Sequence, residues 1–303
     1  MESCLLTGSQ GFLGVLLYQG LKQRLQLSTL GLKAKNDFRV DLSQTIPVFP
    51  TPFDWVIHNA GKAHVVPKTS AEAASFYEVN VLGTIHLLKG LSSAPLLPKT
   101  FIFISSVSVY GLETGLGIAE THPLHGTSPY AKSKIEAENI ITTWGKQNDV
   151  NVIILRLPLV VGPHPPGNLQ SIANAIKKGI YIRIHNNHAQ KSMVLGTDIA
   201  ALILTLEGQS GIYNLTDGIH PTFDQIEDTI AKGLKQPIRF TLPISFFTVL
   251  ARIGDLWHGF PLNTPRLHNI TKSLTFDDQK ARKILSWQPE PALPVFESIE
   301  TWT

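Results

Sequence analysis

The sequence predicts an α/β fold built on a doubly wound parallel sheet, with a smaller C-terminal α/β lobe partly interleaved with it. Short apolar runs rich in β-formers alternate with longer helical patterns in the first half of the chain, and a glycine-rich turn follows the first run. Such alternation implies right-handed crossovers, and therefore parallel strands with helices on both faces. Frequent Pro and Gly after Leu157 mark the point where the chain leaves the sheet.

The expected strands are short runs bounded by turn residues, at 4–7, 27–32, 53–58, 101–104 and 152–155. Apolar residues recur at helical spacing between them and predict helices at 12–25, at about 70–91 and at about 128–144. One more run, at 211–215, predicts a strand that returns to the main sheet.

The second half predicts the smaller lobe. A helix is expected at about 168–178, and Thr222 with Gln225 has the capping-box spacing that begins another. We expect the binding cleft between two parts. The first part comprises residues 1–162 with a returning segment at about 194–218, and the second comprises residues 163–193 and 219–303.

Composition excludes several classes of protein. Of the 303 residues, 43% are apolar and 16% are charged, against a usual charged fraction of about 25%, so the chain is not disordered. The net charge of +3 comes without blocks of like charge, so no nucleic-acid partner is expected. Cys4 is the only cysteine, which excludes an internal disulfide and fits a reducing compartment.

A membrane partner is not expected either. The longest apolar stretch, residues 152–161, is interrupted by Arg156 and Pro158, whereas a bilayer span needs about 20 apolar residues. No targeting segment is seen, so the sequence predicts a soluble, cytoplasmic protein.

The glycine-rich turn has the spacing Gly8-x-x-Gly11-x-x-Gly14. Gly8 permits a tight turn, Gly11 close approach of the backbone to a pyrophosphate, and Gly14 close packing of helix on strand. Three glycines also occur in plain structural turns, but their position in a first βαβ unit predicts a dinucleotide site of the Rossmann type. The residues of this turn expected at the cofactor are Gly8, Gln10, Gly11, Phe12, Leu13 and Gly14.

The choice between NAD and NADP stays open. NAD sites usually place an acid after the second strand, where it binds the ribose 2′-hydroxyl. Here no acid occurs before Asp37, and Lys33 and Lys35 stand in that region. These lysines either accept a 2′-phosphate or are merely solvated.

Tyr130 and Lys134 form a Tyr-x-x-x-Lys pattern at the start of a predicted helix. Residues i and i+4 share a helical face, so we expect the ammonium beside the phenol, where it lowers the pKa of Tyr130 from about 10. Tyr130 then transfers the proton in a hydroxyl-to-ketone conversion. The pattern is common by chance, but the buried strand at 101–104 is followed by Ser105, Ser106 and Ser108, where an α/β sheet has its ligand crevice. One of these three serines is suited to hold the reacting oxygen.

Together these motifs resemble the extended short-chain dehydrogenase/reductases, specifically the NAD-dependent epimerase/dehydratase family that acts on nucleotide sugars. The similarity covers nearly the whole chain. Further motifs that carry it are Asn59-Ala60-Gly61, Tyr110-Gly111, Arg156-Leu157-Pro158, Val161-Gly162-Pro163, Tyr213-Asn214-Leu215 and the segment from Lys280 to Trp287.

The resemblance implies roles for single residues. Ser106, Tyr130 and Lys134 match the catalytic trio, and Asn80 matches a helix asparagine that supports it. Other positions expected at the cofactor are Lys33, Asp41, Leu42, Asn59, Ala60, Gly61 and Leu157, with Tyr130 and Lys134. Positions expected at the substrate are Lys62, His64 (for which a structural role is an equal alternative), Ser106, Ser108, Asn168, Leu169, Lys191 and Arg266. Lys191 stands where 4-epimerases usually carry Arg, so the charge is kept and the bidentate fork is lost.

The implied activity is hydride transfer at C4 of a nucleotide diphospho-sugar, with NAD or NADP. The first hypothesis is a UDP-sugar 4-epimerase, which retains NAD and returns the hydride. The second is a 4-ketoreductase of a UDP-4-keto-6-deoxy-hexosamine, which consumes NADPH or NADH. A non-catalytic dinucleotide sensor is the third, but it has no need of a poised phenol. A 4,6-dehydratase is disfavoured because Val107 and Ser108 replace the Asp-Glu pair that eliminates water.

A homodimer is expected, because the helices at about 70–91 and 128–144 resemble the pair that forms a four-helix interface in relatives. The apolar segment 242–257 lacks a cationic face, which favours packing within the lobe over binding at a membrane surface.

No metal is expected. Two histidine pairs have i,i+3 spacing, His122 with His125 and His185 with His188, but they lack carboxylate or thiol partners, and a zinc site needs three or four ligands.

Overall fold

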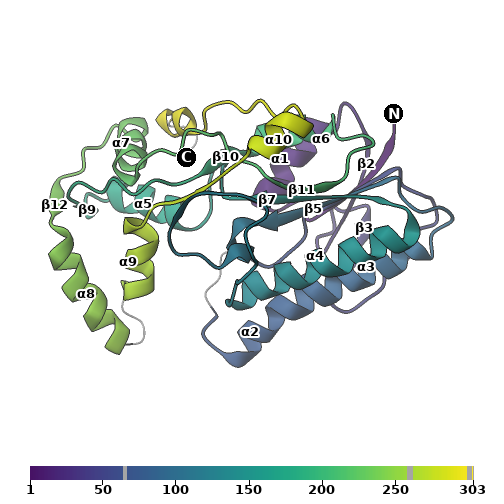
Figure 1. Ribbon diagram of the computed structural model, residues 1–303, viewed down its shortest axis with the longest axis horizontal. Coiled ribbons are helices and arrows are strands. Elements are labelled where there is room, and N and C mark those ends of the chain that lie inside the picture. Colours follow the sequence, from purple (N-terminus) through teal and green to yellow (C-terminus); the bar gives the residue numbers. More distant parts are fainter. Residues whose placement is uncertain (64–66, 258–261, 299–301, 303) are drawn as a thin grey trace.

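A parallel sheet of seven strands forms the centre of the computed structural model, which describes residues 1–63, 67–257, 262–298 and 302 (Figure 1). The strand order is β11-β7-β5-β4-β1-β2-β3, and every neighbouring pair is parallel. The strands are β1 (Ser3–Thr7), β2 (Gln26–Gly31), β3 (Phe38–Arg39), β4 (Trp55–His58), β5 (Thr100–Ser106), β7 (Asn151–Leu157) and β11 (Gly211–Asn214). The doubly wound sheet and the returning strand are confirmed, whereas β3 is too short to be predicted.

Helices cover both faces of this sheet (Figure 1). One face carries α2 (Ser70–Tyr77), α3 (Gly83–Ser92) and α4 (Pro129–Asn148), and the other carries α1 (Phe12–Leu21), α6 (Gly196–Ile203) and α10 (Gln279–Ile284). A π-helical turn, η1 (Glu78–Leu82), joins α2 to α3. The helix expected at about 70–91 therefore exists, but its middle turn is wider than an α-helical turn.

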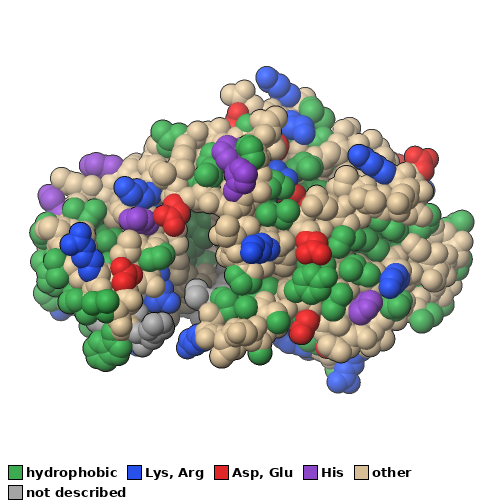
Figure 2. Space-filling view, turned by 60° about the horizontal axis from the view of Figure 1, so that its bottom comes forward, with side chains coloured by type: hydrophobic (Ala, Val, Ile, Leu, Met, Phe, Trp, Pro, Cys, Tyr) green, Lys and Arg blue, Asp and Glu red, His purple; other side chains and the backbone are tan. Residues whose placement is uncertain are grey.

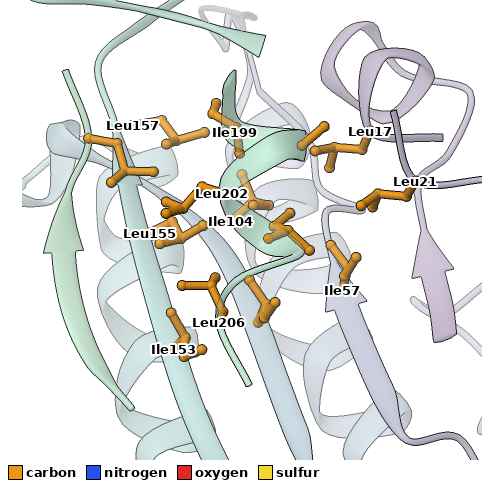
Figure 3. Packing of buried hydrophobic residues seen from close by; sticks show 14 of the residues in the cluster. Leu17, Leu21, Ile57, Ile104, Ile153, Leu155, Leu157, Ile199, Leu202 and Leu206 are labelled. Atoms are coloured by element: carbon orange, nitrogen blue, oxygen red, sulfur yellow. The ribbon is translucent and has the colours of Figure 1, made fainter. Parts of the chain in front are cut away.

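The largest apolar cluster lies between the sheet, α1 and α6. Figure 3 shows Leu17 of α1, Ile199 of α6 and Ile57 of β4 pointing into this cluster. Gly20 lets the two helices touch, because a Cβ there would lie 2.6 Å from the Cβ of Ala200. This packing holds α6, which comes late in the sequence, on the sheet formed by the first half of the chain.

The remaining helices gather at one end of the molecule (Figure 1). They are α5 (Asn168–Lys177), α7 (Phe223–Gly233), α8 (Ile244–Leu256) and α9 (Thr264–Thr271). The pair β9 (Ile182–Ile184) with β12 (Phe240–Leu242) lies with these helices (Figure 1). Two more parallel pairs lie outside the main sheet, β8 (Leu159–Val161) with β10 (Met193–Leu195) and β6 (Gly115–Ile118) with β13 (Leu274–Phe276). Two 3₁₀ turns complete the elements, η2 (Val107–Tyr110) and η3 (Leu293–Glu297). The exact boundaries of the two parts stay a prediction.

The capping box that begins α7 is confirmed. Thr222 Oγ1 accepts from the N–H of Gln225 at 3.3 Å, and the N–H of Thr222 donates to Gln225 Oε1 at 2.8 Å. Two N–H groups at this end of the helix are thereby satisfied.

The apolar segment 242–257 differs from the expectation. It contains α8, but Ala251 is the only buried residue of that helix, and Val249, Leu256 and the following Trp257 are 59%, 87% and 68% exposed. Hydrophobic side chains are visible at this end of the molecule in Figure 2. The expected packing is wrong for this face, because α8 packs on α9 through its other face. Within the described ranges, no helix is long and apolar enough to cross a bilayer.

Candidate active site

The glycine turn forms a cradle at the start of α1. Gly8 has a φ of +68°, in the left-handed region that favours glycine, and a Cβ there would lie 2.7 Å from the Cα of Ala60. A Cβ on Gly14 would lie 2.0 Å from the carbonyl oxygen of Gly8. α1 begins at Phe12, so the N–H groups of its first turn are available to an anion. The turn therefore fits the pyrophosphate of a dinucleotide.

A chain of hydrogen bonds lies behind this cradle. Oγ1 of Thr7 lies 2.8 Å from Nδ1 of His58, and Nε2 of His58 lies 3.0 Å from Oγ1 of Thr84. Thr84 donates its own hydrogen to the carbonyl of Asn80 at 2.6 Å, so it accepts from Nε2–H of a neutral histidine. Burial lowers the pKa of His58 to about 3. His58 is not among the residues expected from the sequence, although a histidine that ends an apolar strand is a usable signal.

Asn80 connects the loop after β4 to the start of α4. Its Oδ1 accepts from the N–H of Lys62 at 2.7 Å, and its Nδ2 donates to the Lys62 carbonyl at 3.1 Å and to Ser133 Oγ at 2.8 Å. Ser133 in turn donates to the carbonyl of Tyr130 at 2.8 Å. Asn80 lies in the π-helical turn, a feature that often occurs at functional sites. It holds the backbone around Tyr130, as a supporting role requires.

Ser106, Tyr130 and Lys134 come together where β5 ends and α4 begins. Ser106 is the last residue of β5, and Ser128 caps α4 by accepting an N–H at 3.1 Å, which places Tyr130 in the first helical turn. The hydroxyl of Ser106 lies near enough to that of Tyr130 to lower its pKa. Lys134 Nζ, one helical turn further on, donates to the carbonyl of Ile104 at 2.8 Å.

The protonation of this trio differs from the expectation. Burial raises the pKa of Tyr130, and the neighbouring Ser106 hydroxyl opposes this rise. Burial also lowers the pKa of Lys134 to about 8, while the charge of Glu138 opposes that fall. The expectation that the ammonium lowers the pKa of Tyr130 is wrong for this structure, because the loss of water around both side chains dominates. Tyr130 is therefore a neutral phenol at pH 7 that is able to donate its proton.

A buried ion pair lies beneath the trio. Arg156 Nη2 is 2.6 Å from Glu138 Oε2, and each side chain is 3% exposed. Glu138 Oε1 also accepts from Arg156 Nε at 3.1 Å and from Ser105 Oγ at 2.5 Å. Arg156 Nη1 donates to the Tyr110 hydroxyl at 3.1 Å, and Tyr110 donates to Asn214 Oδ1 at 2.7 Å. The network joins α4 to β5, β7 and β11.

The residues expected at the adenosine lie around the ends of β2 and β3. Asp41 Oδ1 accepts from the N–H and hydroxyl of Ser43 at 3.0 Å and 2.7 Å. Leu42 is buried, and its carbonyl oxygen lies 2.7 Å from Nδ1 of His86. Lys33 is exposed in the turn that follows β2.

Two further expected residues lie beside the trio. Leu157 ends β7 and is paired in register with Ser106. Ser108 donates its N–H to Ser106 Oγ at 3.2 Å, and its own Oγ is buried with no hydrogen-bond partner among the described residues. A buried hydroxyl of this kind suits a polar group of a ligand. His64 lies outside the described residues.

The last expected substrate residues lie in the second lobe. Asn168 is the first residue of α5, Leu169 beside it is buried, and Arg266 lies in the first turn of α9. Lys191 Nζ donates to the carbonyl of Lys272 at 2.7 Å, and burial lowers the pKa of Lys191 to about 8. No hydrogen bond within the described ranges joins these side chains to the trio. Figure 2 shows a hollow between this end of the molecule and the rest.

In the described part of the chain, no group of three or more His, Cys, Asp or Glu side chains is arranged to hold a metal ion.

The chain is similar to proteins of known activity. The family model described as "NAD dependent epimerase/dehydratase family" matches residues 4–214. A UDP-glucose 4-epimerase of Vibrio cholerae is 26% identical over 319 residues, which cover 96% of this chain and 92% of that protein. Two solved structures share the fold. One is RMD from Pseudomonas aeruginosa complexed with NADPH, with a TM-score of 0.75, 22% identity and 99% of each chain covered. The other is UDP-glucose 4-epimerase of Thermus thermophilus in complex with NAD, with a TM-score of 0.73, 21% identity and coverage of 99% of this chain and 98% of that one.

Proposed function

The chain belongs to the NAD dependent epimerase/dehydratase family, as an NAD(P)-dependent epimerase/reductase of the extended short-chain dehydrogenase/reductase type, and from this premise we propose that it is a UDP-sugar 4-epimerase. The observation that carries the proposal is the meeting of Ser106, Tyr130 and Lys134 at the end of β5, in a fold whose glycine cradle fits a dinucleotide. The similarity to the Vibrio cholerae UDP-glucose 4-epimerase supports the choice of substrate.

Each residue of the trio has a task in this reaction. Ser106 Oγ accepts from the N–H of Ser108, which leaves its own hydrogen to hold the sugar O4. As a phenol, Tyr130 donates its proton to O4 when a ketone is reduced, and the phenolate that this leaves takes the proton back from O4 when the hydroxyl is oxidised. Lys134, charged below about pH 8, stabilises the phenolate that Tyr130 becomes after donating its proton. When bound, the dinucleotide accepts and returns the hydride.

The second lobe holds the nucleotide diphosphate in this proposal. Asn168 begins α5, whose first N–H groups suit an anion without added charge. Lys191 adds a point charge, held in place by its bond to the Lys272 carbonyl. This division leaves the reacting sugar to the trio.

A 4-ketoreductase of a UDP-4-keto-6-deoxy-hexosamine is the second candidate. Two observations favour it. Tyr130 is a neutral phenol, which suits protonation of a ketone, and no acid follows β2 before Asp37, so the usual carboxylate partner of NAD is missing. The two reactions differ in whether the oxidised dinucleotide leaves.

The two candidates are separated by the cofactor that stays with the purified protein. The 4-epimerase is expected to retain a dinucleotide near one per chain and to convert UDP-glucose to its C4 epimer with none added, as followed by mass spectrometry and NMR. Conversion of a 4-keto sugar nucleotide only with added NADPH or NADH supports the reductase. Absence of both conversions contradicts chemistry at C4.

We also propose that two copies of the chain associate through α3 and α4. A groove of about 710 Å³ lies between these helices, lined by apolar side chains such as Ile85, Leu88 and Ile140. A second copy of the same helix pair presents matching apolar side chains, so a two-fold interface buries both grooves.

A further inference from the structure

The turn after β2 decides how the adenosine ribose is recognised. NAD and NADP differ at the ribose 2′ position, which lies at the carboxyl end of the second strand in this kind of fold, and NAD sites place a carboxylate there. Asp37 is the first acid after β2, but its Oδ2 accepts from the N–H of Thr29 at 2.8 Å and from the Thr29 hydroxyl at 2.9 Å. Its own N–H donates to Thr29 Oγ1 at 3.1 Å. These bonds hold the carboxylate beside Thr29 within β2. It therefore stabilises the strand and is not available to a ribose at the end of the strand.

An amide side chain occupies the strand end instead. Asn36 is buried, its Oδ1 accepts from Ser9 Oγ of the glycine turn at 3.1 Å, and its Nδ2 donates to the carbonyl of Lys33 at 2.9 Å. A Cβ on Gly31 would lie 3.0 Å from Nδ2 of Asn36, so the amide fills the space beside the last residue of β2. The bonds fix the turn of residues 33–36 against the phosphate cradle.

Cations surround this fixed turn. Arg39 is paired in register with Gly31, and its Nε donates to the carbonyl of Leu32 at 3.3 Å, which folds the guanidinium over the strand end. Its two terminal nitrogens make no hydrogen bond to any residue that the structure describes. Lys33 and Lys35 are exposed nearby, so residues 32–39 carry three cations against the single acid Asp37.

We propose that this turn binds the 2′-phosphate of NADP or NADPH, with the terminal nitrogens of Arg39 as its main partner and Lys33 as added charge. A planar guanidinium with two N–H groups side by side matches phosphate oxygens, and a phosphate of about two negative charges suits the surplus of cations. The proposal rests on the proposed hydride chemistry. Binding of NADP is compatible with either candidate reaction, although the missing acid after β2 that supports it is also one of the observations that favour the reductase.

The test is direct binding of NADPH and of NADH, each titrated by calorimetry, without sugar, into the full chain from which any co-purified dinucleotide has been removed. NADPH is expected to bind at least about tenfold more tightly than NADH, and Arg39→Ala to weaken NADPH by about 10- to 100-fold, the loss of a charge-assisted hydrogen bond. The affinity of the Arg39→Ala protein for NADH is expected to stay within about twofold of that of the unaltered protein. The control is Arg24→Ala, which removes an exposed cation beyond the opposite end of β2 and is expected to change neither affinity.

Equal affinities in the unaltered protein, or tighter NADH, overturn the proposal. An Arg39→Ala protein that keeps its preference for NADPH, or that loses both ligands equally, overturns the role of Arg39. If Arg39→Ala does not fold, Lys33→Ala replaces it, with a smaller loss expected for NADPH alone. An NADPH preference without any sugar turnover contradicts only the proposed function, since no sugar takes part in this measurement.

Discussion

At the scale of single residues, burial controls the groups that move protons. Tyr130 is held as a phenol by loss of solvent, so its reactivity depends on its hydroxyl hydrogen and on its contact with Ser106. Tyr130→Phe removes only that hydroxyl. We expect the variant to fold and to bind the dinucleotide as before, and turnover to fall by about 10²- to 10⁴-fold, the usual contribution of a general acid–base group. Steady-state rates and a dinucleotide titration check this, and turnover within about threefold of the parent contradicts the role.

His58 makes a prediction about acid stability. Burial lowers its pKa from 6.5 to about 3, so below pH 6.5 the unfolded chain binds a proton that the folded chain does not. Stability is therefore lost as the pH falls from 6.5 toward 3, by about 2 kcal/mol between pH 7 and pH 5. His58→Gln is expected to have a lower free energy of unfolding than the parent at pH 7. This difference between the two proteins is expected to be about 2 kcal/mol smaller at pH 5. Urea unfolding at both pH values measures the gap, and an unchanged gap contradicts the assignment.

At the scale of elements, the Arg156–Glu138 pair joins α4 to the centre of the sheet. Removing one partner leaves an uncompensated buried charge, which typically costs about 3–5 kcal/mol. Glu138→Gln is thus expected to lower the free energy of unfolding by about that amount. The matched control is Glu297→Gln, which breaks the exposed Lys232–Glu297 pair and should cost less than about 1 kcal/mol. Equal losses in the two variants contradict the structural role of the buried pair.

Some of these elements can be predicted from the sequence, and others cannot. The main strands follow from continuous apolar runs, and the glycine turn follows from backbone requirements at Gly8 and Gly14, which are local properties. The π-helical turn at residues 78–82 has no local signal, because it depends on the contacts of Asn80 with two other segments. The expected lowering of the Tyr130 pKa is wrong for a related reason. Spacing on a helix predicts that two side chains lie close together, but how deeply they are buried depends on the whole fold.

The same distinction applies to α8. Its pattern is amphipathic, and an amphipathic pattern predicts one covered face. Which face of such a helix stays uncovered depends on where α9 packs, and that packing leaves Val249 and Leu256 exposed. The sequence predicts the helix but not its surroundings.

At the scale of the whole molecule, association through α3 and α4 is testable by mass. We expect a dimer at micromolar concentration and a monomer for Ile140→Lys, which places a charge in the apolar groove. Leu96→Lys, on an exposed side chain outside the residues that line the groove, is the control and should stay dimeric. Light scattering measures the mass, and a monomeric parent contradicts the proposed interface.

We propose that the second lobe binds the nucleotide diphosphate, and this proposal gives a prediction for Lys191. Burial lowers its pKa to about 8, so the ammonium that attracts a diphosphate is present below pH 8 and is lost as the pH rises through that value. The affinity for UDP-glucose is therefore expected to be higher at pH 7 than at pH 9 in the parent. Lys191→Ala should weaken it by about tenfold at pH 7, as expected for one charge-assisted hydrogen bond, and remove most of the pH dependence.

Lys191→Arg is the matched control, because a guanidinium keeps its charge at pH 9 and should hold the affinity there. The dinucleotide is titrated in parallel, and its affinity should stay unchanged in both variants, since we propose that its phosphates bind at the glycine cradle, on the other side of the proposed cleft. If Lys191→Ala loses dinucleotide affinity and keeps UDP-glucose affinity, the two ends of the molecule have the opposite roles. If it loses both, Lys191 supports the fold of the lobe through its bond to the Lys272 carbonyl rather than meeting the substrate.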